Sequence, residues 1–417
     1  MADHGGMTRT TGPAGPAPAR TAARARVATY VMFAFQAMLF ASWTAHIPLV
    51  KGALALSDGE LGLSLFGAPI GSVVATFATS WLLPRVGSRR MVQASLLGYL
   101  ATAWLVGVVD SSAGLFGALL AWGMFQGSLD VSMNAQAVFV ERAVGRPLMS
   151  GFHATWSLGG FTGAGLGVVA VSAGVALAPQ LIGLAVVGLV IAGGATLVML
   201  PDPAPEAAHE SARPGLAAAW LHPAVVTLGL IVLASMLCEG AAADWSAVYL
   251  HESLGAAPGF AALAYTFYSA AMVTCRLAGD RLLARYSPRS LLPLLAAIAT
   301  IGMLAGLLTG VPVVVIAGFV VLGFGLGLVV PAAFTAVGRL EGVHTGTAVA
   351  AVSAIGWLGY VAGPPVIGHI ADLVTLPVAL GIVPLLTALT AISVRVSRRF
   401  DPAPAAEPVV GGTISPA

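Results

Sequence analysis

The sequence predicts an all-α integral membrane protein in which twelve transmembrane helices form two similar six-helix bundles. The first observation is composition: 58% of the 417 residues are hydrophobic and 9% are charged, whereas soluble domains carry roughly 25% charged residues. The second is a steady succession of apolar segments, each long enough for a bilayer core that needs about 20 helical residues. The third is the gathering of basic residues on one side of the predicted membrane.

The apolar segments define the elements in order. Residues 1–26 are rich in Gly, Ala, Pro and Thr and are expected to form a disordered cytoplasmic tail. The first apolar segment exceeds the roughly 7–15 residues of a signal-peptide core, so we interpret it as an uncleaved first helix. The predicted spans are 27–50, 61–83, 91–109, 114–140, 150–173, 179–200, 223–250, 260–283, 290–310, 312–338, 345–371 and 376–396.

A polar linker divides these spans into two groups of six. It covers residues 201–222 and is rich in proline, as is typical of a flexible connection. The predicted N-terminal bundle therefore covers 27–200 and the C-terminal bundle 223–397, and a second disordered cytoplasmic tail follows at 398–417. The two halves also match each other, because Trp43 precedes Arg85 as Trp245 precedes Arg285, with a two-span hairpin in each interval. We therefore expect a duplicated six-helix unit.

The basic residues indicate how the chain is oriented. All but two of the 19 Lys and Arg residues fall in cytoplasmic segments if the N-terminus is cytoplasmic. The exceptions are Lys51, in a predicted outside loop, and Arg276, within a predicted span. Because cytoplasmic loops carry an excess of basic residues, this pattern predicts a multi-pass protein of the cytoplasmic (inner) membrane with both termini inside. The scattered charges form no patch that would indicate nucleic-acid binding.

An acid and several amides interrupt the fourth predicted span, whose sequence here is Gln126-Gly-Ser-Leu-Asp130-Val-Ser-Met-Asn134-Ala-Gln136. Gln126, Asp130 and Asn134 are spaced by four residues and share one helix face. An ionisable group at bilayer depth costs at least ~2.5 kcal/mol, so it usually faces a bundle interior or a water-filled cavity. We interpret this face as the wall of a polar path through the membrane. A buried polar clamp between helices is the alternative.

Other polar residues within the spans complete the candidate site. Glu239 lies well inside the seventh span and, with Asp130, is a candidate proton carrier. The predicted substrate-cavity residues are Gln36, Gln126, Asn134, Trp156, Asp244, Trp245, Tyr268 and Trp357. Asp244 is equally consistent with a helix-end or gate residue, and packing or interfacial anchoring explains most membrane tryptophans. His46 and His153 fit hydrogen-bonded fixtures near the membrane boundaries better than proton relays.

The loop between the second and third spans carries a recognisable motif. It reads Ser80-Trp-Leu-Leu-Pro84-Arg85-Val-Gly87-Ser-Arg89-Arg90. This loop resembles the Gly-x-x-x-Asp-Arg-x-Gly-Arg-Arg motif of the major facilitator superfamily, with Ser80 in place of its glycine and Pro84 in place of its aspartate. A degenerate copy in the second half places Arg285 in register with Arg85. The resemblance implies a cytoplasmic gate formed by Arg85, Arg89 and Arg285; simple anchoring of helix ends is the alternative.

Longer strings resemble one branch of that superfamily, the bacterial YbjJ-like permeases, which are distantly similar to sugar symporters of the fucose permease type. These strings begin at Asp130, Arg146 and Glu239 and include His153, Trp156 and Trp245. The resemblance covers almost all of residues 27–396. It implies two rocking bundles of the superfamily fold and a transport activity, without a named cargo.

Together these observations predict a secondary active transporter for a small solute, sugar-like or another small metabolite, which works by alternating access and is coupled to protons. No P-loop or cluster with metal-ligand spacing is visible, so no enzyme activity, cofactor or metal is expected. The expected partners are the solute, protons and membrane lipids, and the chain is expected to act as a monomer. The alternatives are a drug or metabolite exporter of the same fold and a membrane sensor that binds a ligand without moving it.

Overall fold

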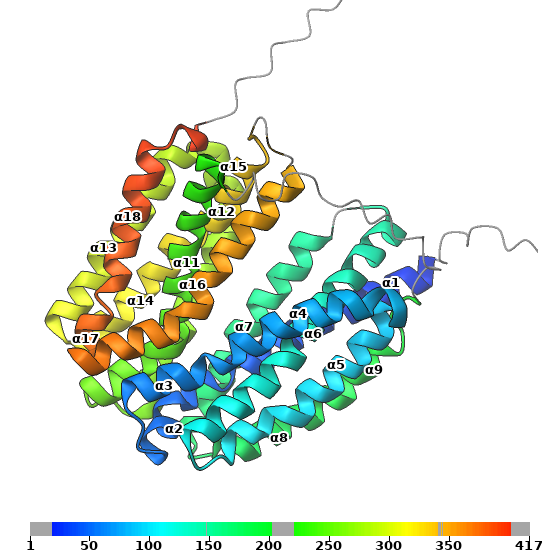
Figure 1. Ribbon diagram of the computed structural model, residues 1–417, viewed down its shortest axis with the longest axis horizontal. Coiled ribbons are helices and arrows are strands. Elements are labelled where there is room, and N and C mark those ends of the chain that lie inside the picture. The colour runs from blue at the N-terminus through cyan, green and yellow to red at the C-terminus, as the bar shows by residue number, and fades with distance from the viewer. Residues whose placement is uncertain (1–18, 147, 202–220, 341–342, 344, 402–417) are drawn as a thin grey trace, which may run out of the picture.

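The computed structural model describes residues 19–146, 148–201, 221–340, 343 and 345–401. Within these residues the regular structure is helical and no strand occurs. Figure 1 shows the helices of the first half gathered in one bundle and those of the second half in another. The predicted all-α architecture of two helical bundles is confirmed.

The first half of the chain forms helical segments that are partly interrupted. In order they are α1 (Ala19–Ala41), continued by η1 (Thr44–His46) and α2 (Ile47–Ala53); α3 (Asp58–Leu65) with α4 (Gly67–Val86); α5 (Ser88–Ala103) with η2 (Trp104–Gly107); α6 (Ser112–Val144); α7 (Met149–Ser172); and α8 (Leu177–Gly188), continued by η3 (Leu189–Gly193) and α9 (Gly194–Thr196). Gly87, with a φ of 90°, makes the turn between α4 and α5, a conformation that favours glycine.

The second half repeats this plan. Its segments are α11 (Pro223–Val248) with η4 (Tyr249–Ser253), α12 (Pro258–Arg285), α13 (Pro288–Thr309), α14 (Pro312–Leu326) with α15 (Val329–Val337), α16 (Thr345–Leu373), α17 (Leu376–Ala379) with α18 (Ile382–Val396), and η5 (Arg398–Phe400). Prolines open α11 to α14, where a missing N–H has no partner to lose.

Nine helical segments among the described residues are long and apolar enough to cross a membrane. The other three predicted spans correspond to α5 with η2, α6 and α12, and each of these contains charged residues. The arrangement is consistent with the predicted twelve spans, whose ends agree with the helices to within a few residues in most cases.

The same helix pairs pack together in both bundles. The first predicted span packs on the fifth as α1 on α7, and the seventh on the eleventh as α11 on α16. A Cβ atom added to Gly159 or Gly163 of α7 would lie 2.1 Å from a carbonyl oxygen of α1, and one added to Gly359 of α16 would lie 2.2 Å from a carbonyl oxygen of α11. These glycines allow the backbones to touch, as at small-residue seams of membrane helices. This matching pair of contacts is consistent with the predicted duplication of a six-helix unit.

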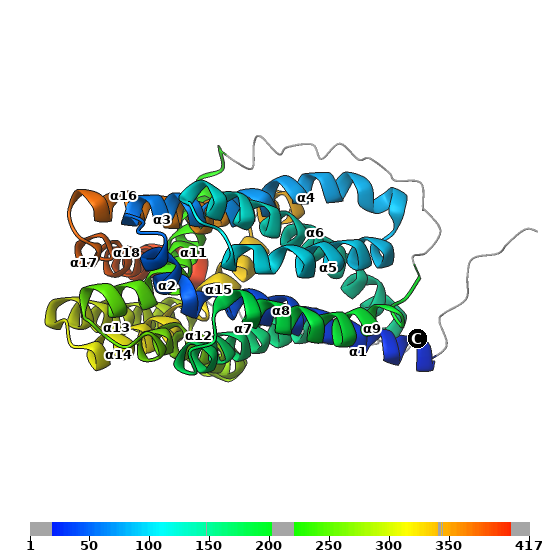
Figure 2. The same ribbon diagram turned by 90° about the horizontal axis from the view of Figure 1, so that it is seen from below.

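The two bundles meet at one end and diverge toward the other (Figure 1). We call the end that contains Lys51, Asp58, Glu252 and Asp372 the closed end, and the end that contains Arg85 and Arg285 the open end. At the closed end α3 crosses α16, a contact that Figure 2 also shows. A Cβ atom on Gly62 of α3 would lie 2.4 Å from the Pro364 carbonyl oxygen of α16. The bundles are thus in backbone contact at this end.

The structure corrects both predicted tail boundaries. The first helix begins at Ala19 rather than Val27, because the Ala-rich stretch favours helix and buries Ala22 and Ala25. At the other end, Phe400 is buried and Asp401 pairs with Arg289 at 2.8 Å, so residues 398–401 are ordered rather than part of a disordered tail. The remaining parts of both predicted tails, and linker residues 202–220, lie outside the described residues.

Candidate functional site

The polar face of the fourth predicted span lies on α6. Asp130, Asn134 and Gln126 are all half-buried. The Asn134 Nδ2 donates to the Asp130 carbonyl oxygen at 2.8 Å and approaches the Asp130 Oδ1 at 3.4 Å. Asp130 and Asn134 thus form a small polar cluster in an otherwise apolar span, as is typical of a residue that faces a bundle interior or a cavity.

Two predicted cavity residues, Gln36 and Trp156, meet between α1 and α7. The Trp156 Nε1 donates to the Gln36 Oε1 at 2.7 Å, and the Tyr99 hydroxyl of α5 donates to the Gln36 backbone oxygen at 2.9 Å. Gln36 is 3% exposed. In this conformation Gln36 is therefore a buried partner that orients the Trp156 indole.

Glu239 pairs within its own bundle with a residue that the sequence prediction did not include in the site. The Arg276 Nη2 of α12 is 4.0 Å from the Glu239 Oε2 of α11. The Arg276 Nη1 also donates to the Ser157 Oγ of α7, at 3.2 Å, across the bundle boundary. The sequence did hold a signal, because Arg276 is the one basic residue placed within a predicted span.

Aromatic side chains pair on the helices that follow Glu239 in the second bundle. Tyr265 and Tyr268 stack with ring centroids 6.0 Å apart, and Trp357 meets Tyr360 edge to face at 5.8 Å. Tyr265, Tyr268 and Tyr360 come from α12 and α16, which both pack on the helix of Glu239, α11. The helices packed on α11 therefore carry hydroxyl-bearing rings as well as aliphatic side chains.

The other predicted cavity residues are not all accessible in this conformation. Trp245 and Tyr268 are 0% and 1% exposed, whereas Trp357 is 47% exposed. The Trp245 Nε1 and the Tyr268 hydroxyl are buried without a hydrogen-bond partner among the described residues. Asp244 is half-buried. Trp245 and Tyr268 therefore belong to the helix packing in this conformation.

The predicted gate arginines contact their own bundle here. Arg85 donates to the Trp81 carbonyl oxygen and lies over the Trp81 ring, 4.0 Å from its centroid. Arg89 donates to the Leu197 carbonyl oxygen at 2.8 Å, near the end of α9, and Arg285 lies over Tyr286. These contacts fit the anchoring of helix ends. A gate would act in a second conformation, in which the bundles meet at the end that contains Arg85 and Arg285. The gate role of these arginines stays a prediction.

Lys51 is the other basic residue outside the cytoplasmic set, and it links the bundles at the closed end. Its Nζ lies 2.8 Å from the Asp58 Oδ1 and also contacts the Glu252 Oε2 of the second bundle. Nearby, the Ser57 Oγ donates to the Asp372 Oδ2 at 2.9 Å, again between bundles. Both basic residues that the orientation pattern left out thus make contacts between the bundles.

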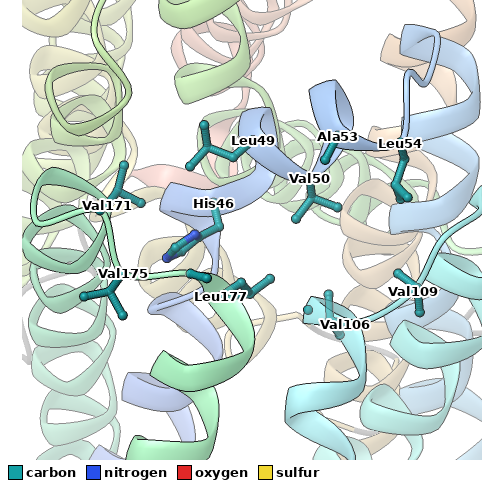
Figure 3. A pocket seen from close by; sticks show the side chains of 13 residues that line it. His46, Leu49, Val50, Ala53, Leu54, Val106, Val109, Val171, Val175 and Leu177 are labelled. Carbon is teal, nitrogen blue, oxygen red and sulfur yellow. The ribbon is translucent and has the colours of Figure 1, made fainter.

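His46 lies beside a cavity of about 310 Å³ near the closed end. Figure 3 shows it among apolar side chains such as Val50, Val106 and Val175, and no other polar side chain lines the cavity among the described residues. The His46 Nε2 is 2.7 Å from the Gln180 Oε1, and the Gln180 Nε2 donates to the Ser42 carbonyl oxygen. This geometry fits a hydrogen-bonded fixture.

Comparisons with known proteins place this chain in one family. The model of the Major Facilitator Superfamily matches residues 228–413. An uncharacterized MFS-type transporter of Yersinia pestis is 34% identical over 376 residues, which are 90% of this chain and 96% of that protein. The solved structure of a mutant of the nucleoside transporter NupG has a TM-score of 0.74 at 13% identity, over 88% of this chain and 98% of that chain. The D-xylose-proton symporter has a TM-score of 0.65 at 14% identity, over 91% and 98%.

Proposed function

Because the chain belongs to the major facilitator superfamily of membrane transporters, we propose that it carries a small solute across the cytoplasmic membrane by alternating access and that protons drive this transport. A member of this family is a transporter and not an enzyme. The solute would be sugar-like or another small metabolite, and the assignment to the YbjJ-like branch stays a prediction.

The observation that carries this proposal is the asymmetry between the two ends. The bundles are joined at the closed end by Lys51 and Glu252, and they diverge at the open end. Alternating access needs this arrangement and its converse, related by rocking one bundle against the other. In the orientation that the basic residues predict, the open end faces the cytoplasm, so the conformation is inward-open.

That orientation has a direct test. Reporter domains fused after Arg399, or within residues 201–222, are expected to register as cytoplasmic, and one fused after Ser111 is expected to register as external, because the basic residues set the orientation. Alkaline phosphatase and fluorescent protein fusions measure this in intact cells. An external C-terminus would mean that the number of spans is odd.

The half-buried carboxylates support the proton part of the proposal. Asp130 and Glu239 lie in α6 and α11, one in each bundle, and Glu239 has an ion-pair contact with Arg276 at 4.0 Å. An ionised carboxyl is costly in a low-dielectric site that excludes water, whereas a protonated one is not. Closure of the bundles over a protonated site would therefore be easier than closure over an ionised one.

The function is tested by uptake into proteoliposomes that contain the purified chain. A panel of sugars, nucleosides and small metabolites is offered with and without an inward proton gradient. The expected result is accumulation of one class of solute that collapses when a protonophore is added. Movement of a solute only out of the vesicles would favour the exporter alternative. Saturable binding of a solute without any transport would favour the sensor alternative.

A further inference from the structure

A second cavity lies at the open end of the second bundle, away from the Glu239 region. Its volume is about 410 Å³, within the roughly 300–1,000 Å³ of small-molecule sites. Its lining residues are Leu283, Ala284, Arg285, Tyr286, Ser287, Pro288, Ala332, Thr335, Ala336, Arg339, Arg399 and Phe400. They come from the ends of α12 and α15, the start of α13 and the short helix η5.

The cavity is strongly basic. Arg285, Arg339 and Arg399 line it, and no acidic residue does so among the described residues. The Asp401 carboxylate pairs with Arg289 at 2.8 Å, and the Asp401 backbone oxygen accepts from the Arg339 Nη1 at 3.2 Å. Three guanidinium groups at one cavity repel one another, and an anion bound among them would offset this repulsion.

The start of α13 adds to the positive field. Ser287 is the residue that precedes this 22-residue helix and Pro288 is its first residue, and both line the cavity. The N-terminal end of a helix carries the positive end of its macrodipole, which favours anions. The helix end and the arginine cluster are independent features with the same preference.

We propose that this cavity binds a phosphate group. Guanidinium groups are planar forks whose N–H donors match phosphate oxygens in pairs, and several such forks suit a phosphate better than a single carboxylate. The group belongs either to the head of an anionic phospholipid or to a soluble phosphate. Tyr286 beside the cavity is 49% exposed, and an aromatic ring next to arginines is typical of the membrane interface.

The test measures the unfolding temperature of the purified full chain in detergent. The probes are short-chain phosphatidylglycerol, short-chain phosphatidylcholine and inorganic phosphate. The expected result is a concentration-dependent stabilisation by phosphatidylglycerol or by phosphate, with little effect of the zwitterionic lipid. A response to phosphatidylglycerol alone identifies a lipid headgroup, and an equal response to inorganic phosphate identifies a soluble phosphate.

Arg399→Gln provides the first variant. The Arg399 side chain has no hydrogen bond or ion pair among the described residues, so we expect its replacement to leave the fold intact. Its matched control is Arg398→Gln. This variant removes the same charge from the neighbouring residue, which does not line the cavity. The apparent Kd for the stabilising probe is expected to weaken about tenfold or more in Arg399→Gln, and further in Arg339→Gln/Arg399→Gln. The control should match the wild type.

Two results would overturn the proposal. One is the absence of stabilisation by both phosphatidylglycerol and phosphate in the wild type. The other is an equal Kd for the wild type, the Arg398→Gln control and the Arg399→Gln variant. This test needs no solute and no transport assay, so it stands or falls independently of the proposed proton coupling.

Discussion

Replacement of Asp130 by Asn together with Glu239 by Gln is expected to abolish the accumulation of solute on a proton gradient, while solute exchange across the membrane continues. Both amides imitate protonated carboxyls, so the loaded site can close but no proton is released on the far side. With one proton per solute, a gradient of one pH unit sustains about tenfold accumulation in the wild type, since one unit is worth about 1.4 kcal/mol. The double variant should stop at equal concentrations.

The single variants and a control make this result interpretable. Asp110→Asn removes a carboxylate from the exposed loop before α6 and should still accumulate solute like the wild type. Exchange of labelled for unlabelled solute in the same vesicles reports whether each variant still binds and moves its cargo. If Asp130→Asn and Glu239→Gln each concentrate solute as the wild type does, neither residue carries the proton, and substrate binding or structural clamping becomes the better account.

Replacement of Lys51 by Met is expected to shift the chain away from the conformation described here. Lys51 is 7% exposed, and its removal leaves the carboxylates of Asp58 and Glu252 facing each other across the bundle boundary. Loss of one partner of a fully buried pair costs about 3–5 kcal/mol. The Glu252 side chain is 32% exposed, so solvent screening reduces this to roughly 1–3 kcal/mol. A change of that size alters the ratio of conformations by about five- to more than a hundredfold.

Distances between spin labels would measure this change. Labels on cysteines at positions Arg142 and Arg281 lie on α6 and α12, near the open end of opposite bundles. The native Cys238 and Cys275 are buried and should remain unlabelled. Lys51→Met should add a population with a shorter distance as the open end closes, while Lys51→Arg keeps the wild-type distribution. An unchanged distribution in Lys51→Met would show that the lysine does not hold the closed end.

Much of the fold could be predicted because membrane spans obey simple constraints. A helix is the only open-chain structure that satisfies its own backbone in lipid, so length and apolar composition located the spans. The loop charges then predicted the orientation. The start of α1 was placed too late because the basic residues before Val27 look polar in sequence, although the alanines between them bury one face of the helix.

The site was harder to predict because its contacts join residues far apart in the chain. Helical spacing can group Gln126, Asp130 and Asn134 because all three lie on one helix, α6. Arg276 meets Glu239 and Ser157 through three different helices, and no local pattern encodes that meeting. The sequence also could not tell which end is closed, because two packings of one transporter differ by only a few kcal/mol.

Proton movement driven by the solute is the most direct test of the central claim. Proteoliposomes that contain the wild-type chain and a trapped pH-sensitive dye are first equilibrated without a gradient, and a transported solute is then added outside. Proton-coupled uptake predicts that the lumen acidifies as solute enters, and that Asp130→Asn/Glu239→Gln takes up solute without this signal. Entry of solute into wild-type vesicles with no change in luminal pH would contradict the account.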